Sequence, residues 1–148
     1  MFIDTNVYVY VAIKHPEFFD KCYKVLQMLV DGEYEGYGSK FVLFELFGAL
    51  SKINPVAAYE ASYYYLNLPL KSLDMDREAL ELARDIAIKS GVTYDAIHAA
   101  MMMRNNITTI ITEDLRDWLR IQNIWAEAAK KHKLDVGMLE VLAPSRDL

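Results

Sequence analysis

Acidic residues stand directly after two apolar runs of this 148-residue sequence. Asp4 follows the short run Met1–Ile3, and Asp114 comes just after Ile107–Ile111, a run that is β-branched throughout and apolar enough to lie inside a sheet. Ligands of open α/β sheets bind beyond the carboxyl ends of the strands. If both runs are strands of one sheet, Asp4 and Asp114 are candidates for the same crevice.

Two further acidic residues fall within predicted helices. Glu45 interrupts the apolar stretch 41–47. A helix that is apolar on nearly all sides is expected to be buried, and an isolated buried carboxylate is costly unless it is paired, protonated or bound to a metal. Asp95 lies in the first turn of a helix that Thr93 can cap, where its charge also favours the helix dipole by about 0.3–1 kcal/mol. Asp95 therefore has a structural and a functional interpretation, whereas Glu45 needs a cation, an active-site group or a structural partner.

These four acids together predict a site for a divalent cation. Carboxylates at close range raise each other's pKa, because like charges resist ionisation, and a hard cation removes that repulsion. Mg²⁺ prefers oxygen ligands and often bridges a substrate phosphate. A bound ion lowers the pKa of a water and stabilises charge on the attacked phosphate. We therefore expect Mg²⁺ or Mn²⁺ and a phosphate-ester substrate at Asp4, Glu45, Asp95 and Asp114.

The elements that must position these acids alternate between short strands and longer helices. Helix periodicity and capping residues predict that Ser39 begins a helix, that Asn54-Pro55 restarts one, and that Asp74 caps another, which ends at Gly91. Strands separated by helices indicate an α/β fold of three layers, α/β/α, with a central, mostly parallel sheet of about five strands. We expect a single domain over residues 1–148, with strands near 1–3, 34–38, 70–73, 107–111 and 138–142 and helices near 17–31, 39–53, 55–65, 75–90, 94–102 and 115–132.

Composition excludes several classes of protein. Apolar residues make up 53% and charged residues 25%, which excludes intrinsic disorder, and 16 basic against 21 acidic residues give a net charge of −5. Bulk positive charge therefore does not predict a partner such as duplex DNA or an anionic membrane surface. The one cysteine, Cys22, cannot form an internal disulfide and is expected in the core. No apolar stretch approaches about 18 residues, and no signal peptide is evident, so we expect a soluble, cytoplasmic protein without a membrane span.

The four acidic motifs, in their order along the chain, resemble those of the PIN-domain nucleases, in particular the small VapC-type toxins. Ile3–Val7 (IDTNV) resembles the first motif of the family, and Glu45 matches its second acidic position. Tyr94–Ala100 (YDAIHAA) is similar to the third motif and is the most specific match, and Ile110–Asp114 (IITED) resembles the fourth. Each motif alone is weak evidence, but the set spans residues 3 to 114.

The fourth acidic position has two candidates. Family members commonly follow the last Asp closely with a second Asp and an aromatic residue, and here Asp117-Trp118 stands one residue further from Asp114 than that pattern implies. Either Asp114 or Asp117 could fill the position. We favour Asp114 because it adjoins the predicted strand.

The resemblance implies a Mg²⁺- or Mn²⁺-dependent endoribonuclease that hydrolyses phosphodiester bonds of single-stranded or structured RNA. The metal ligands and catalytic residues would be Asp4, Glu45, Asp95 and Asp114. Toxins of this type are neutralised by a cognate antitoxin whose tail covers the acidic groove, and they commonly form homodimers. The resemblance therefore also implies RNA, an antitoxin and a second copy of the chain as partners.

Residues beside the motifs have alternative roles. Thr5 could hydrogen-bond a carboxylate or a metal-bound water, or only the local backbone, and Asn6 is expected mainly to stabilise its loop. His98, one turn after Asp95, is interpreted as supporting the site or packing in the core, because a hard oxygen-ligated site does not need a histidine. His15 and His132 are expected at the surface.

Charged and aromatic clusters suggest contacts with partners. Arg116 and Arg120 follow the fourth motif and are the basic residues that we expect to contact RNA. The lysines near the motifs are expected to be solvated surface charges. Met101–Met103 covers more than one helical face, which core packing and a subunit contact could share. Tyr59 and Tyr63–Tyr65 predict either an exposed aromatic surface for a dimer or antitoxin, or ordinary amphipathic packing.

Three other functions compete with a toxin. A housekeeping RNA-processing nuclease would use the same residues. A PIN-fold module that only binds RNA or protein is disfavoured by four intact acidic positions. A different Mg²⁺-dependent phosphoryl enzyme, such as an aspartate-nucleophile phosphatase or a receiver domain, would need a second Asp where Asn6 stands, or a Lys after Ile107–Ile111, and this sequence has neither.

Overall fold

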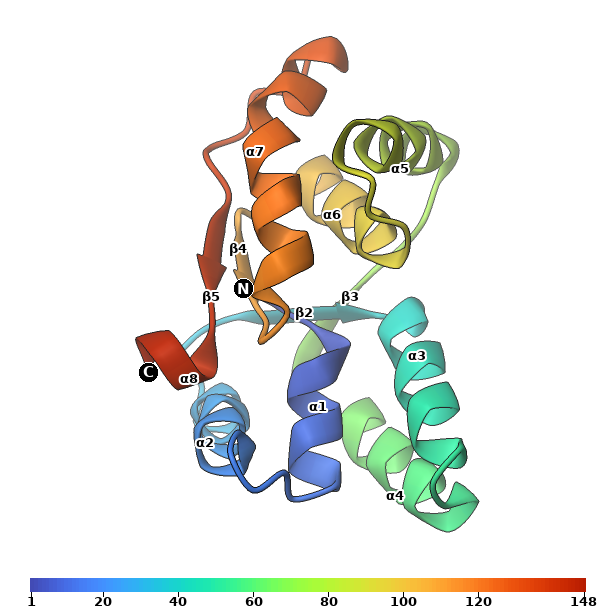
Figure 1. Cartoon of the computed structure of the whole chain (residues 1–148), viewed down its shortest axis with the longest axis vertical. Coiled ribbons are helices and arrows are strands. Elements are labelled where there is room, and N and C mark those ends of the chain that lie inside the picture. The colour runs from blue at the N-terminus through green and yellow to red at the C-terminus, as the bar shows by residue number, and fades with distance from the viewer.

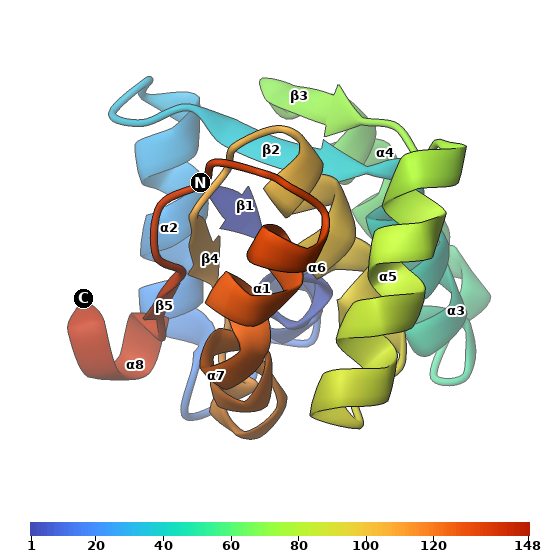
Figure 2. The same cartoon turned by 90° about the horizontal axis from the view of Figure 1, so that it is seen from above.

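One parallel sheet of five strands forms the centre of the molecule. The structure is a computed structural model that describes all residues, 1–148. Its strands lie in the order β3-β2-β1-β4-β5, every neighbouring pair is parallel, and the sheet twists strongly from β3 to β5 (Figure 2). The bounds are β1 Phe2–Ile3, β2 Gly36–Ser39, β3 Leu70–Leu73, β4 Thr109–Ile111 and β5 Glu140–Leu142.

Helices cover the sheet in two groups. Helices α1 to α4 pack together on one side, and α5 to α7 pack together on the other (Figure 1). The arrangement confirms the predicted three-layer α/β/α class. The helices are α1 Thr5–Ala12, α2 Phe19–Val30, α3 Lys40–Ser51, α4 Pro55–Leu66, α5 Arg77–Ser90, α6 Tyr94–Arg104, α7 Leu115–Lys131 and α8 Pro144–Asp147. None of them combines the length and the apolar character that crossing a membrane requires.

The chain order creates a crossover point at the middle of the sheet. From β1 the chain moves outward through β2 to β3, and it then returns to the other side of β1 to build β4 and β5. Such a reversal leaves a crevice at the carboxyl ends of the two central strands. Here those ends are followed by Asp4, after β1, and by Thr112, after β4.

Helix α1 is the main element that sequence reasoning missed. Its residues, TNVYVYVA, are rich in β-branched and aromatic side chains, which favour strands locally. Asp4 nevertheless begins a helix here, because its side chain accepts a hydrogen bond from Thr5 N. A second correction concerns α5, which is capped by Asp76 through Ala79 N and not by Asp74.

The structure decides one expectation about side-chain burial that had two alternatives, and it contradicts another. Met101, Met102 and Met103 are all buried within this chain, so no subunit contact is needed to cover them. Helix α3 is apolar on most sides yet not buried, since Phe44 is 65% exposed. The argument that Glu45 must sit in a fully buried helix therefore fails, although Glu45 itself is partly buried.

Tyr65 does not belong to the exposed aromatic surface. It is buried, and its hydroxyl donates to Ser39 O and accepts from Ser39 N, both at 3.0 Å. Tyr59, Tyr63 and Tyr64 are exposed as expected. Cys22 is buried, as predicted.

His132 and His15 are not free surface residues. His132 Nε2 lies 2.6 Å from Oδ2 of Asp85, whose side chain is only 5% exposed, and Lys131 Nζ lies 3.3 Å from the same oxygen. These contacts join α5 to the end of α7. His15 packs against Phe18 and its Nδ1 accepts backbone N–H groups from residues 17 and 18. Both histidines sit in local hydrogen-bond networks, which sequence spacing does not reveal.

Replacing Asp85 with Asn should lower the free energy of unfolding by about 1.5–3 kcal/mol at neutral pH, because hydrogen bonds to charged groups contribute that much. Burial alone raises the pKa of Asp85, but hydrogen bonds from His132, Arg84 and Lys131 lower it to about 2. A depressed pKa stabilises the fold above the unfolded value of about 3.9, and this stabilisation disappears as the pH falls from about 4 to 2. Chemical denaturation across this range measures the difference between the two proteins. The exposed Asp135→Asn variant is the control, and equal effects of both substitutions would contradict the assignment.

Candidate active site

The buried carboxylate of Asp4 lies at the crossover point and is held by donors from three parts of the chain. Its Oδ1 accepts from Thr5 N at 2.8 Å. Its Oδ2 accepts from Thr112 Oγ1 at 2.8 Å, from Trp118 Nε1 at 2.9 Å and from Asn6 Nδ2 at 3.2 Å. Asp4 is only 3% exposed, so these bonds fix both its position and its rotamer.

Thr112 and Trp118 are the site residues that sequence reasoning missed. Thr112 directly follows β4 and is fully buried, and it also accepts a hydrogen bond from Asp114 N at 3.0 Å. Trp118, in the first part of α7, is fully buried as well. The fourth motif contains Thr112, and Trp118 follows Asp117, so a signal was present, but their pairing with Asp4 spans more than 100 residues.

Asn6 links the two strand ends directly. Besides its contact with Asp4, its Nδ2 donates to Thr112 Oγ1 at 3.0 Å, and its Oδ1 accepts from Glu113 N at 3.0 Å. The expected loop-stabilising role of Asn6 therefore extends across the sheet. It joins the first turn of α1 to the loop after β4.

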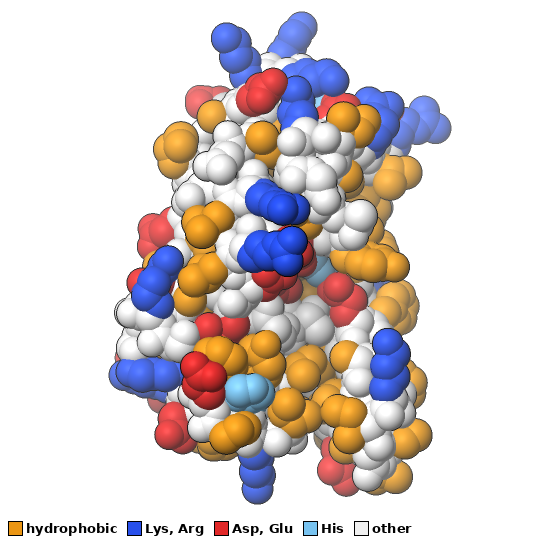
Figure 3. All heavy atoms as spheres, viewed as in Figure 1, with side chains coloured by type: hydrophobic (Ala, Val, Ile, Leu, Met, Phe, Trp, Pro, Cys, Tyr) orange, Lys and Arg blue, Asp and Glu red, His pale blue; other side chains and the backbone are white.

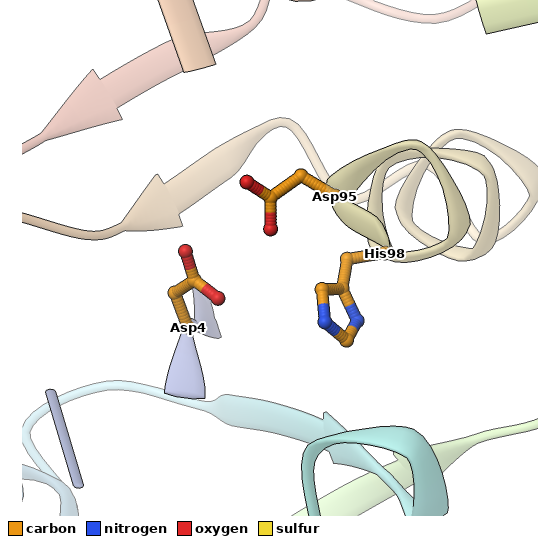
Figure 4. Close-up of side chains that lie close together, drawn as sticks. All are labelled: Asp4, Asp95 and His98. Atoms are coloured by element: carbon orange, nitrogen blue, oxygen red, sulfur yellow. The ribbon is translucent and has the colours of Figure 1, made fainter. Parts of the chain in front are cut away.

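Asp95 projects from the first turn of α6 toward Asp4 (Figure 4). Its carboxylate accepts no hydrogen bond from any protein group, although it is partly buried. Burial, followed by the charge of Asp4, raises the pKa of Asp95 to about 8, and Asp114 and Glu45 add to the rise. Without a cation, this carboxyl group is therefore largely protonated at neutral pH.

Asp114 and Asp117 approach Asp95 from the start of α7. Ligand atoms of these three residues lie within 4.8 Å of one another. Asp114 caps α7, since its Oδ1 accepts from Asp117 N at 3.3 Å. Burial raises the pKa of Asp114 against the opposing effect of that hydrogen bond. Both candidates for the fourth acidic position thus face the same point.

Glu45 belongs to neither of these groups of potential ligands, although its charge acts on Asp95, and it is tied to other elements through one oxygen. Its Oε1 accepts from Thr5 Oγ1 at 2.9 Å and from His98 Nε2 at 2.5 Å. Burial raises the pKa of Glu45, but the hydrogen bond and charge of His98 outweigh it, so the net pKa lies below its usual value. Thr5 therefore bonds a carboxylate, one of the two roles considered for it.

His98 is 1% exposed and connects Glu45 to the site. Burial lowers the pKa of His98, but the hydrogen bond with Glu45 and the charge of Asp4 outweigh burial and raise it overall. Its Nδ1 has no hydrogen-bond partner, and one ring nitrogen lies within 4.8 Å of ligand atoms of Asp4 and Asp95. His98 therefore belongs to the site's immediate surroundings, next to the core residue Phe2.

Basic side chains border the acidic centre. In the space-filling view, Asp and Glu side chains gather near the middle of the face, and Lys and Arg side chains over α7 lie beside them (Figure 3). Arg116 and Arg120 are exposed on α7, and neither forms an ion pair within the chain. Both guanidinium groups are thus available to an anionic ligand.

The donor set fits a hard divalent cation. Two groups of three potential ligands share Asp95, and one consists of carboxylates only. Carboxylate oxygens suit Mg²⁺ and Mn²⁺, whereas soft metals select thiolates, of which this site has none. The lack of any protein donor to Asp95 also fits, because a buried carboxylate requires some partner.

Comparisons with known proteins identify the family of the chain. The PIN domain family model matches residues 1–124. Among solved structures, VapBC2 from Rickettsia felis bound to a DNA fragment from its promoter is similar, with a TM-score of 0.65, 19% sequence identity and coverage of 96% of both chains. A sequence search of curated proteins finds no significant match. Because the family model covers most of its length, the chain belongs to the PIN domain family.

Proposed function

We propose that this protein is a Mg²⁺- or Mn²⁺-dependent endoribonuclease that hydrolyses phosphodiester bonds of RNA. The observation that carries the proposal is a pair of potential ligand groups that share Asp95: one adds Asp4 and His98, and the other adds Asp114 and Asp117. Membership of the PIN domain family supports a nuclease. Burial and, after it, the charges of neighbouring acids raise the pKa of Asp95 to about 8, which supports a cation as the common partner of these carboxylates.

Asp4, Asp95 and Asp114 are the proposed metal ligands, and Asp117 supports them. Asp4 is fixed by its four donors, so it offers an oriented carboxylate at no further conformational cost. Asp95 has both carboxylate oxygens free of protein donors and can reach either group of ligands. A cation held by these residues would lower the pKa of a water and would stabilise negative charge on the attacked phosphate.

Glu45 completes the proposed site from the opposite helix group. Thr5 and His98 occupy its Oε1, which leaves Oε2 free of protein hydrogen bonds. In the proposed reaction this oxygen accepts a proton from the attacking water or contributes to holding the ion. His98 keeps Glu45 ionised and oriented, as a positioning residue.

Arg116 and Arg120 are the proposed RNA contacts. They are exposed near the acidic centre, and a guanidinium binds phosphate oxygens with matched geometry. The net charge of −5 does not conflict with an RNA substrate, because the acidic charges at the site would be neutralised by the ion.

The biological role we propose is that of a toxin with a cognate antitoxin. The similarity to the toxin–antitoxin complex VapBC2 supports this role. The exposed side chains of Tyr59, Tyr63 and Phe44 on α3 and α4 offer an apolar surface for the antitoxin or a second copy of the chain. A toxin that cuts RNA would act in the cytoplasm.

The variants Asp4→Asn and Asp95→Asn should each cleave a labelled single-stranded RNA pool at least about 100-fold more slowly than the wild type in the presence of metal. Mutating a residue that hydrogen-bonds a metal ligand typically lowers metal affinity or activity 10–100-fold, and mutating a ligand itself should lower activity more. Cleavage is measured with Mg²⁺, with Mn²⁺ and with EDTA. Asp135→Asn, an exposed acidic residue outside the site, should cut at the wild-type rate. Metal-independent cleavage, or equal rates in all variants, would contradict the proposal.

The metal-free protein should become less stable as the pH rises from about 4 to 8. A raised pKa means that the folded state binds the Asp95 proton more tightly, so its stabilisation is present below the unfolded pKa and is lost as the pH passes about 8. Asp95→Asn should therefore melt at a higher temperature than the wild type at pH 8 in EDTA. Thermal melts at pH 5 and pH 8 give the comparison.

Mn²⁺ at about 100 times its Kd should then stabilise the wild type at pH 8 by about 2.7 kcal/mol, or roughly 5–10 °C. The same addition should raise the melting temperature far less at pH 5, where Asp95 is protonated, and hardly at all in Asp95→Asn. A cation effect of equal size in Asp95→Asn would show that the ion binds elsewhere.

A further inference from the structure

A pocket of about 330 Å³ opens directly beside the acidic centre. It lies between α3 and α6 and is lined by Phe41, Phe44, Glu45, Tyr94, Ile97 and His98. Its volume falls in the range of ligand pockets, roughly 300–1,000 Å³. Most of its lining side chains are aromatic or aliphatic, and the remaining two are the carboxylate of Glu45 and the imidazole of His98.

This pocket shares two residues with the proposed active site. Glu45 and His98 line its wall and are also hydrogen-bonded to each other next to Asp4 and Asp95. An occupant of the pocket is thus held one or two side chains away from the point where the carboxylates converge. Whatever fills it must be part of, or adjacent to, the group that reacts.

Two aromatic side chains at the pocket are left in solvent. Tyr94, which directly precedes Asp95, is 74% exposed. Phe44, which directly precedes Glu45, is also largely exposed. Neither is needed to cover the core, and each belongs to a different helix. Large exposed apolar side chains that converge on a pocket indicate a binding site.

We propose that this pocket binds an unpaired nucleobase next to the phosphodiester bond that is cut. The proposal rests on the proposed ribonuclease function, since RNA carries a planar aromatic group beside every phosphate. Proteins recognise single-stranded RNA by stacking its bases on Tyr and Phe side chains. This stacking contributes a similar binding free energy for each of the four bases. Lys40, exposed at the start of α3 and without an ion pair, adds positive charge beside Phe41.

The inference narrows the substrate class to RNA that is single-stranded, or has a bulged or looped base, at the cleavage site. In an A-form duplex the bases stay stacked inside the helix and cannot enter a lateral pocket. Extruding a paired base costs a few kcal/mol, so paired RNA should bind more weakly. Specificity among the four bases is not expected from stacking alone.

The test measures binding and cleavage separately. In an Asp95→Asn background, which blocks cutting, fluorescence anisotropy gives the Kd for labelled oligoadenylate and for the same strand annealed to oligouridylate. Phe44→Ala and Tyr94→Ala should each weaken single-strand binding roughly 5- to 150-fold and leave duplex binding unchanged. Tyr94→Phe should restore the affinity. Tyr23→Ala, at an exposed tyrosine of α2 outside the pocket, should have no effect.

Unchanged single-strand affinity in Phe44→Ala and Tyr94→Ala would overturn the inference, even if these variants lost affinity for a protein partner. Equal weakening for single strand and duplex would also overturn it. Both side chains are largely exposed, so melting temperatures close to the background confirm that the variants are folded. Failure of the ribonuclease proposal is distinguishable, because it appears as absent metal-dependent cutting by the wild type and leaves the binding result intact.

Discussion

The site depends on one buried carboxylate that is held in place before any ligand arrives. Asp4 accepts hydrogen bonds from Thr5 N and from the side chains of Asn6, Thr112 and Trp118. These donors come from α1, the end of β4 and α7, so the carboxylate joins the two central strands to a helix from each layer. The fold can keep this charge buried because all of its donors are supplied, and the remaining acids are arranged around a fixed point.

The other acids do not share that support, and this difference gives the site its chemistry. Asp95 has no protein donor, and burial, followed by the charges of Asp4, Asp114 and Glu45, raises its pKa to about 8. Without a cation, Asp95 therefore holds a proton at neutral pH, and the proposed divalent cation would take the place of that proton. Glu45 differs from both Asp4 and Asp95, because hydrogen bonds from His98 and Thr5 to one of its oxygens keep it ionised.

Much of this arrangement could be predicted from local patterns, and the rest required contacts between distant residues. The strand ends at Asp4 and Thr112, the Ser39 cap and the order of acidic motifs follow from short stretches of sequence. Helix α1 could not be recognised, since its composition favours a strand and the cap at Asp4 decides the outcome. Glu45 was singled out on the assumption of a buried helix, yet its helix is half-exposed and its partner, His98, lies 53 residues away. The Trp118 bond to Asp4 and the pairing of Asp85 with His132 depend equally on tertiary contacts.

The most direct test of the central claim is a crystal structure with bound Mn²⁺, read from the anomalous difference map. A cation site formed by these carboxylates predicts a peak within about 2.3 Å of an Asp95 oxygen and of an oxygen from Asp4 or Asp114. The Asp4 carboxylate should stay in its present rotamer, still bonded to Thr112 and Trp118. A map without a peak at this point, with Asp95 unchanged in the presence of saturating Mn²⁺, would contradict the account.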